Sequence, residues 1–140
     1  MKNNICPGIL LVIGLMSDFA FADAKVIVNT KAGVTRLSQK EIAEIFLGNR
    51  TLWDNGLKIK VARLDSDDDV TTNFIEKTMN MKPRVYIAHW RKQLFSGSGV
   101  PPKSFKNQDE LKEFVANNEG AIGFVRDGSS LPASIKVINY

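Results

Sequence analysis

The residues best suited to chemistry lie in one short segment, where an arginine is followed by an acidic run. Arg63 precedes residues 65–69, which read DSDDD, and Thr71 follows two positions later. An arginine neutralises negative charge, and hydroxyl groups at a helix start donate hydrogen bonds to oxyanions. Arg63, Ser66 and Thr71 therefore form one candidate set for binding an anion.

The same segment supports two other interpretations. Arg63 could pair with a neighbouring carboxylate at the end of a strand, and we favour this ion pair over anion binding. Asp65, Asp67 and Asp69 alternate as at the start of a calcium loop, but Val70 stands where such a loop needs glycine. We favour a solvated acidic run that caps a helix over a weak divalent-cation site, and we predict no metal site.

Few other side chains in the sequence offer chemistry. Residues 97–99 read GSG with Lys103 nearby, and Ser98 is the fourth candidate ligand-binding residue because such a loop could hold an anion through backbone donors. His89 is the only histidine and Cys6 the only cysteine. No serine and acid can be named beside His89 as a triad. We therefore predict a non-enzyme with no cofactor and no catalytic residue, in which His89 packs or lies at a helix surface.

The amino-terminal residues indicate export. Lys2 precedes a mainly apolar run at residues 5–16, and small-x-small patterns end at Ala22 and Ala24. These are the features of a cleavable signal peptide. We expect a signal peptide at residues 1–22, with cleavage after Ala24 as the alternative, and one periplasmic domain at residues 23–140. Because Cys6 leaves with the signal, we expect no disulfide. We also expect no membrane insertion after cleavage, because Pro7, Gly14 and Asp18 interrupt an apolar run that is shorter than a membrane span.

The charge balance is mildly basic. The formal net charge is +4, and cleavage after Ala22 does not alter it because Lys2 and Asp18 leave together. This charge hints at anionic partners. The basic residues are scattered, with no arginine-rich tract and no zinc-finger spacing, so we predict no nucleic-acid partner.

Capping residues and apolar periodicity predict an alternating α/β chain. Ser38 and Glu41 form a capping box, Gly48 ends the helix that follows, and Pro83 opens a later helix. Gly123 within a buried strand indicates a second backbone close by. The expected strands are residues 26–28, 57–64, 121–125 and 135–138, the last at an edge, and the expected helices begin near residues 38, 70, 83 and 107. This order predicts a mixed or parallel sheet flanked by helices.

Two aromatic features are expected to serve the core. Tyr86, Trp90 and Leu94 fall on one helical stripe, which more often packs inward than binds a ligand. Trp53 lies in a predicted loop, and we expect it to tuck over the core.

Three motifs in order resemble a known family. Residues 37–48 contain LS, EI and IFLG, residues 53–56 read WDNG, residues 90–102 read WRKQLFSGSGVPP, and residues 120–125 read GAIGFV. Over residues 26–125 the chain resembles phosphate ABC-transporter substrate-binding proteins, including their short stand-alone members. The resemblance implies a single lobe of a type-2 periplasmic binding protein, an α/β domain with a mixed sheet. It also implies phosphate or another small anion as ligand and a membrane transporter as partner.

The chain departs from the family pattern at the phosphate cradle. The family pattern after the second strand is Arg-x-Asp-Gly-Ser-Gly-Thr, whereas residues 63–69 read RLDSDDD, so Asp67, Asp68 and Asp69 replace the Ser-Gly-Thr donors. Two unit charges ~4 Å apart interact by about 4 kcal/mol at a surface-like dielectric. We therefore expect weak or lost phosphate binding at an open half-site.

The alternative function is an interaction module. A half-binding protein could act as an envelope or sensory accessory that docks on a membrane sensor or transporter. This alternative predicts an exposed apolar patch on the face where the second lobe would sit.

Overall fold

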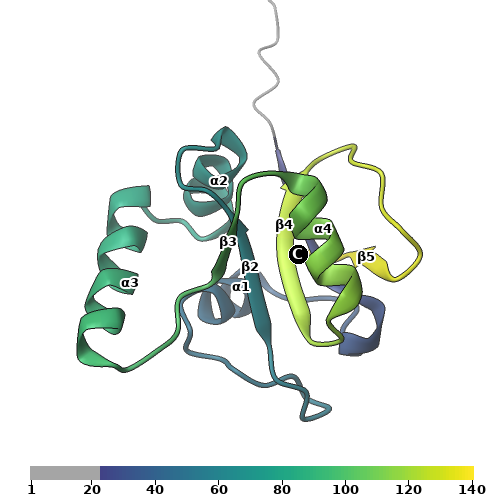
Figure 1. Cartoon of the computed structure of the whole chain (residues 1–140), viewed down its shortest axis with the longest axis horizontal. Coiled ribbons are helices and arrows are strands. Elements are labelled where there is room, and N and C mark those ends of the chain that lie inside the picture. The colour runs from purple at the N-terminus through teal and green to yellow at the C-terminus, as the bar shows by residue number, and fades with distance from the viewer. Residues whose placement is uncertain (1–22) are drawn as a thin grey trace, which may run out of the picture.

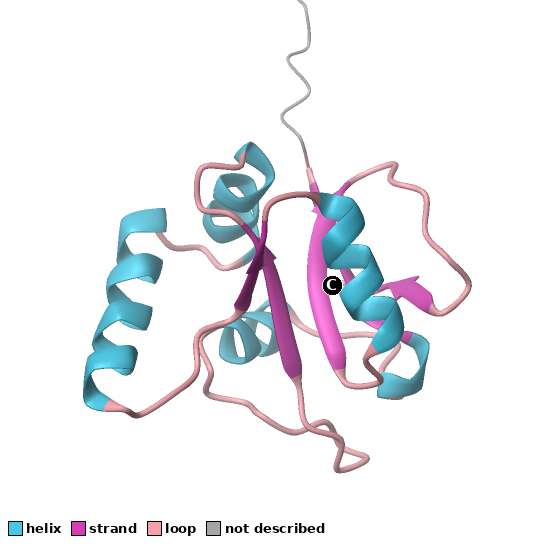
Figure 2. Ribbon diagram, in the orientation of Figure 1, coloured by secondary structure: helices cyan, strands magenta, loops and turns pink. Residues whose placement is uncertain are grey.

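A computed structural model describes residues 23–140, so the predicted signal peptide at residues 1–22 lies outside the described residues. The described chain forms one α/β domain in which strands and helices alternate (Figures 1 and 2). Its elements are β1 (Ala24–Asn29), η1 (Thr30–Ala32), α1 (Gln39–Phe46), β2 (Lys60–Leu64), α2 (Asp69–Asn73), η2 (Phe74–Thr78), α3 (Pro83–Ser96), β3 (Lys103–Phe105), α4 (Gln108–Asn117), β4 (Ala121–Arg126) and β5 (Ile135–Val137). Within these residues no helix combines the length and apolar character that a membrane span requires.

The sheet is mixed, as the sequence predicts. Its strand order is β3-β2-β4-β1-β5. Strand β2 runs parallel to β3 and β4, and β1 is antiparallel to β4 and β5. The edge position expected for the last strand is confirmed. Strand β3 is not among the predicted strands. Its three residues follow two prolines and are too few to show a recognisable alternation of apolar and polar side chains.

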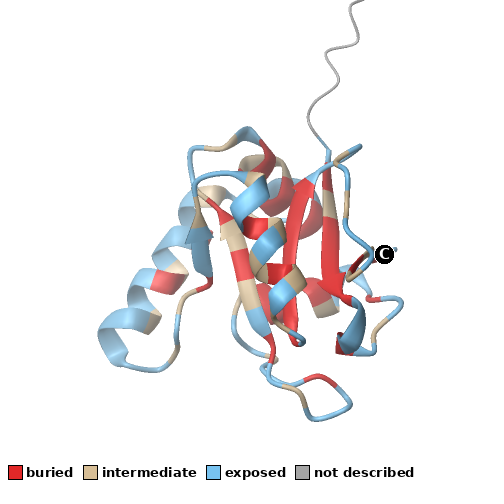
Figure 3. Ribbon diagram, turned by 45° about the vertical axis from the view of Figure 1, so that its right-hand side comes forward, coloured by how far each residue is buried: buried red, intermediate tan, exposed pale blue. Residues whose placement is uncertain are grey.

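Helices cover both faces of the sheet. On one face α4 packs through Leu111 and Val115, which are fully buried (Figure 3). On the other face Phe46, Phe74 and Phe124 form an aromatic cluster, with ring centroids 4.6 Å apart for the first pair and 4.3 Å for the second. This cluster joins α1, η2 and β4, so the core lies mainly in the central strands and the helices beside them.

Local signals set the ends of α1 as predicted. The backbone N–H of Ser38 donates to the Glu41 carboxylate at 2.7 Å, and the Glu41 N–H donates to the Ser38 hydroxyl at 3.1 Å. This bond from the Ser38 backbone lowers the pKa of Glu41. Gly48, just past the helix, has φ +79, a left-handed conformation that glycine adopts without steric cost.

Helix α3 is held through side chains that reach the end of α1. The Tyr86 hydroxyl and the Trp90 indole N–H both donate to the Phe46 carbonyl, at 3.3 and 3.1 Å. Burial raises the pKa of Tyr86 to about 12. The predicted core stripe is wrong at its last member, because the Leu94 side chain is 64% exposed. Leu94 lies in the last turn of α3, beyond the residues that reach α1.

Gly120 marks a close approach of two chain segments. A Cβ atom there would lie 2.0 Å from the Lys58 carbonyl oxygen, which is backbone and cannot swing aside. We expect Gly120→Ala to lower the free energy of unfolding by about 1–3 kcal/mol, the usual cost of forcing an atom into a filled space. Chemical denaturation measures this change.

Gly99→Ala is the matched control for Gly120→Ala. Its Cβ would lie 3.4 Å from the Trp90 ring and 3.9 Å from the Gln93 side chain, which are ordinary contact distances. We expect a change below about 1 kcal/mol for this variant, within the range of substitutions away from a tight contact. Equal losses for the two variants would contradict the contact at Lys58.

Candidate functional site

The parallel strands place several polar side chains at one edge. Because β2, β3 and β4 run in the same direction, their carboxyl ends meet, and ligands of α/β sheets bind at such edges. Arg63 lies near the end of β2, and its guanidinium donates to the Ser66 hydroxyl and to the Leu64 carbonyl, each at 3.1 Å. The structure therefore brings together two of the four predicted ligand-binding residues, Arg63 and Ser66.

The ion pair favoured for Arg63 does not form within the described chain. Two of the nearby carboxylates have other partners. Asp65 accepts a 2.5 Å hydrogen bond from the Ser104 hydroxyl, and Asp68 caps α2 by accepting from the Val70 N–H at 2.9 Å. The prediction that the acidic run caps a helix is thus confirmed.

Asp69 is bound by an arginine that the sequence analysis missed. The Arg126 guanidinium, at the end of β4, lies 2.8 Å from a carboxylate oxygen of Asp69. The hydrogen bond from Arg126 lowers the pKa of Asp69. The backbone N–H of Arg126 also donates to the Gln108 side chain at the start of α4. The sequence contained a signal for Arg126, because a polar residue that directly follows a predicted parallel strand lies at this edge of the sheet.

Thr71 lies in α2 and is buried. Its hydroxyl has no hydrogen-bond partner among the described residues. It therefore does not join the Arg63 and Ser66 pair through any direct bond. A buried hydroxyl without a partner costs free energy.

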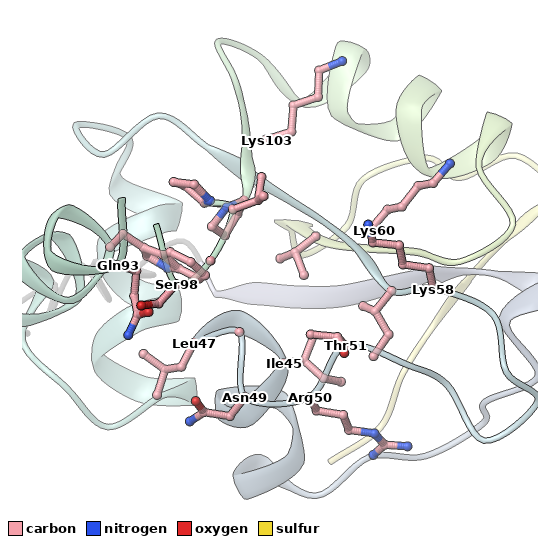
Figure 4. A pocket seen from close by; sticks show the side chains of 18 of the residues that line it. Ile45, Leu47, Asn49, Arg50, Thr51, Lys58, Lys60, Gln93, Ser98 and Lys103 are labelled. Atoms are coloured by element: carbon pink, nitrogen blue, oxygen red, sulfur yellow. The ribbon is translucent and has the colours of Figure 1, made fainter. Parts of the chain in front are cut away.

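Ser98, the fourth candidate, lies in a different place. Its hydroxyl is 2.7 Å from that of Ser96, and it lines a pocket between the start of β2 and α3 (Figure 4). The four predicted residues therefore do not form one site. Lys103, expected near Ser98, does line this pocket.

The pocket has a volume of about 520 Å³ and combines apolar walls with basic residues. It is lined by Ile45, Leu47, Gly48, Asn49, Arg50, Thr51, Lys58, Ile59, Lys60, Val61, Trp90, Gln93, Ser98, Gly99, Val100, Pro101, Pro102, Lys103 and Phe114. No aspartate or glutamate is among these lining residues. The pocket and the carboxyl edge of β2 are thus two separate candidate sites with opposite charge.

Two aromatic predictions can be placed. The side chain of Trp53 is buried and its indole N–H donates to the Gly120 carbonyl at 2.9 Å, which confirms that it tucks over the core. His89 Nε2 lies 2.8 Å from the Leu47 carbonyl oxygen, which can only accept, so this nitrogen carries the proton. His89 therefore has a packing role. Within residues 23–140 no three histidine, cysteine or acidic side chains converge as metal ligands would.

Comparison with solved structures identifies the fold. An ABC-type phosphate transport receptor from Vibrio cholerae superposes with a TM-score of 0.62 at 21% identity, covering 82% of this chain and 44% of that one. A Clostridium perfringens protein, described as a phosphate ABC transporter substrate-binding protein with bound phosphate, gives 0.59 at 20% identity, covering 82% and 43%. PstS from Borrelia burgdorferi gives 0.53 at 14% identity, covering 75% and 40%.

These similarities confirm the predicted fold class, an α/β domain of the periplasmic-binding-protein type. At such identities they show the fold alone. The chain spans less than half the length of each of these structures. No protein-family model matches the sequence, and neither does any curated protein.

The unpartnered Thr71 hydroxyl leads to a stability prediction. Valine has the same shape without the hydroxyl, so we expect Thr71→Val to raise the free energy of unfolding by about 1 kcal/mol, since the cost of an unpaired buried group disappears. Thermal and chemical unfolding in the absence of ligand measure this change.

Thr78→Val is the control for Thr71→Val. Thr78 is equally buried, but its hydroxyl is 2.9 Å from the Tyr140 hydroxyl. We expect this variant to lose about 0.5–1.5 kcal/mol, the net value of one hydrogen bond. A similar loss in Thr71→Val would show that its hydroxyl is satisfied.

Proposed function

We propose that the protein is a periplasmic, non-catalytic solute-binding-like protein related to the phosphate-binding components of ABC transporters, and that its phosphate binding is weak or lost. One observation carries this proposal. The carboxyl edge of β2, where the family resemblance puts the phosphate cradle, carries a carboxylate network built on Asp65, Asp68 and Asp69.

The charges at this edge oppose a phosphate ion. Asp69 holds the Arg126 guanidinium at 2.8 Å, so the cation nearest the helix start is already neutralised. Arg63 donates to Ser66 and to a backbone carbonyl, both within its own segment. An incoming phosphate would have to displace one of these bonds while it approaches several carboxylates. Each such repulsion is about 4 kcal/mol at ~4 Å and a surface-like dielectric.

The non-catalytic part of the proposal rests on the engagement of the reactive side chains. The His89 ring donates to the Leu47 carbonyl, so its Nε2 is not available as a base. At the carboxyl edge the carboxylates of Asp68 and Asp69 are used for a helix cap and an ion pair. The named side chains thus have structural partners rather than a reactive geometry.

The phosphate proposal predicts a gain of function. Restoring the family donors with Asp67→Ser, Asp68→Gly and Asp69→Thr removes three negative charges and releases Arg126. We expect isothermal titration to show no micromolar phosphate affinity in the unmodified mature domain. In the triple variant we expect affinity at least about tenfold tighter, because a repulsion of more than about 1.4 kcal/mol has been removed.

The control for that experiment carries the same charge change elsewhere. Glu76→Gln, Glu113→Gln and Glu119→Gln alter three exposed carboxylates away from the edge of β2. We expect phosphate affinity to stay that of the unmodified domain. Micromolar affinity of the unmodified domain would sink the proposal.

A second function, docking on an envelope sensor or transporter, is favoured by one surface. Phe95 is 86% exposed and follows the exposed Leu94 at the end of α3, and Val100, in the loop after α3, is 87% exposed. Val100 also lines the pocket at the start of β2. Through Val100 this apolar group borders the pocket rather than the carboxyl edge of β2.

The docking function predicts a specific contact through Phe95. A photo-crosslinking residue at this position should give one discrete adduct with an envelope protein in intact cells. The same residue at Lys40, exposed on α1, should give none. The absence of a discrete adduct at Phe95 would exclude docking through this surface.

A further inference from the structure

We propose that the pocket between β2 and α3 binds an amphipathic anion, an apolar body that carries one carboxylate or phosphate group. The pocket lies at the start of β2, so it is distinct from the carboxyl edge at the end of that strand. The inference therefore does not rest on the function proposed above, and it goes beyond it.

The size and walls of the pocket suit an apolar body. Its volume of about 520 Å³ falls in the range of sites for small organic ligands. Ile45 and Leu47 from the end of α1 form one wall (Figure 4). Val61 from β2 and Phe114 from α4 also line the pocket. Burial of an alkyl or aromatic group here removes apolar surface from water on both partners.

The wall formed by α3 is fixed by close packing. A Cβ on Gly48 would lie 2.7 Å from the Trp90 ring, and one on Gly99 would lie 3.4 Å from it. The two loops that flank the pocket thus rest on the ring of Trp90. Its indole N–H is in turn bound to the Phe46 carbonyl, so this wall exists before any ligand arrives. A preformed pocket reduces the ordering cost of binding.

The charge of the pocket selects an anion. Three lysines, Lys58, Lys60 and Lys103, line it without a carboxylate among the lining residues. Lys60 Nζ bonds the neutral Asn118 side chain at 3.0 Å, and Lys103 Nζ lies 5.1 Å from the centroid of the Phe114 ring. These neutral partners position the ammonium groups without cancelling their charge.

Arg50 shows the contrast within the same pocket. Its guanidinium is paired with the Glu41 and Asp54 carboxylates, at 3.2 and 3.1 Å. The net positive charge therefore comes from the lysine side, next to α4, while Ile45 and Leu47 lie on the side across from Lys60 and Lys103 (Figure 4). An inorganic anion would leave the apolar walls wet, and a neutral apolar molecule would leave the lysines unused.

The test measures binding of four probes to the mature domain by isothermal titration, each below its micelle concentration. The probes are decanoate, decyl phosphate, decanol and decyltrimethylammonium. We expect the two anions to bind at least about tenfold tighter than decanol and the cation, as one or two charge contacts would give. Equal binding of all four probes, or no binding of the anions, would overturn the proposal.

Variants locate the site. We expect Lys58→Gln with Lys60→Gln to weaken decanoate binding about tenfold. The same loss is expected for Val100→Glu, which adds a carboxylate at an exposed position and leaves the core intact. Lys40→Gln with Lys82→Gln removes two exposed lysines outside the pocket and should change nothing. Unchanged decanoate binding in both pocket variants would overturn the assignment.

Two sources of the ligand can be separated in the same way. If the protein binds monomeric decanoate but does not sediment with phosphatidylglycerol vesicles, the ligand is a free amphiphile. If the protein sediments with the vesicles and the Lys58 and Lys60 substitutions abolish this, the ligand is a lipid headgroup. If the substituted protein still sediments with the vesicles and the protein does not bind decanoate, the assignment of the pocket as the binding site is contradicted. Phosphate titration of the same variant should match the unmodified domain, which keeps this result separate from the edge of β2.

Discussion

The carbonyl groups at the end of α1 organise the half of the molecule that contains the pocket. The last carbonyls of a helix have no partner within it and must be satisfied from outside. The Glu44 and Ile45 carbonyls accept backbone N–H groups of the following loop, at 2.8 and 3.1 Å. The next two carbonyls, of Phe46 and Leu47, accept from side chains of α3. The end of α1 is thus capped by another helix.

That cap fixes where α3 can lie. Tyr86, His89 and Trp90 lie on one side of α3. Tyr86 and Trp90 bond the Phe46 carbonyl, and His89 bonds the Leu47 carbonyl. The helix is therefore held by its middle. Its last turn projects past the contact, which leaves Leu94 and Phe95 exposed and opens the pocket against β2. The pocket and the exposed apolar group are consequences of one capping arrangement.

The sequence allowed a good prediction of features that depend on near neighbours. The capping box of Ser38, the start of α3 at Pro83 and the glycine stop at Gly48 each involve residues within a few positions of one another. The position of Gly123 could also be inferred, since a Cβ there would lie 2.9 Å from Leu111. Such signals are local in the chain and do not require knowledge of the sheet order.

The candidate sites could be predicted only in part, because they depend on contacts between distant segments. The pairing of Asp69 with Arg126 joins residues 57 positions apart. This pairing can be predicted only once β2 and β4 are known to be parallel neighbours. The surroundings of Ser98 could not be predicted for the same reason, since the strand that follows its loop, β3, was not foreseen.

Strand β3 explains why one sheet carries two edges of opposite charge. It pairs with β2 only from Ala62 to Leu64, so the carboxyl half of β2 is flanked by a strand and its amino half by the pocket. Acidic residues gather where the strands end, and lysines gather where β3 has not yet begun. Pro101 and Pro102 prevent β3 from starting earlier, because proline lacks the N–H that a ladder needs. If the prolines did not shorten β3, the added strand would fill the space in which Lys58 and Lys60 meet the apolar walls. The two proposals thus have one structural origin: anion binding is expected to be weak at the acidic edge and to occur at the opposite end of the same strand.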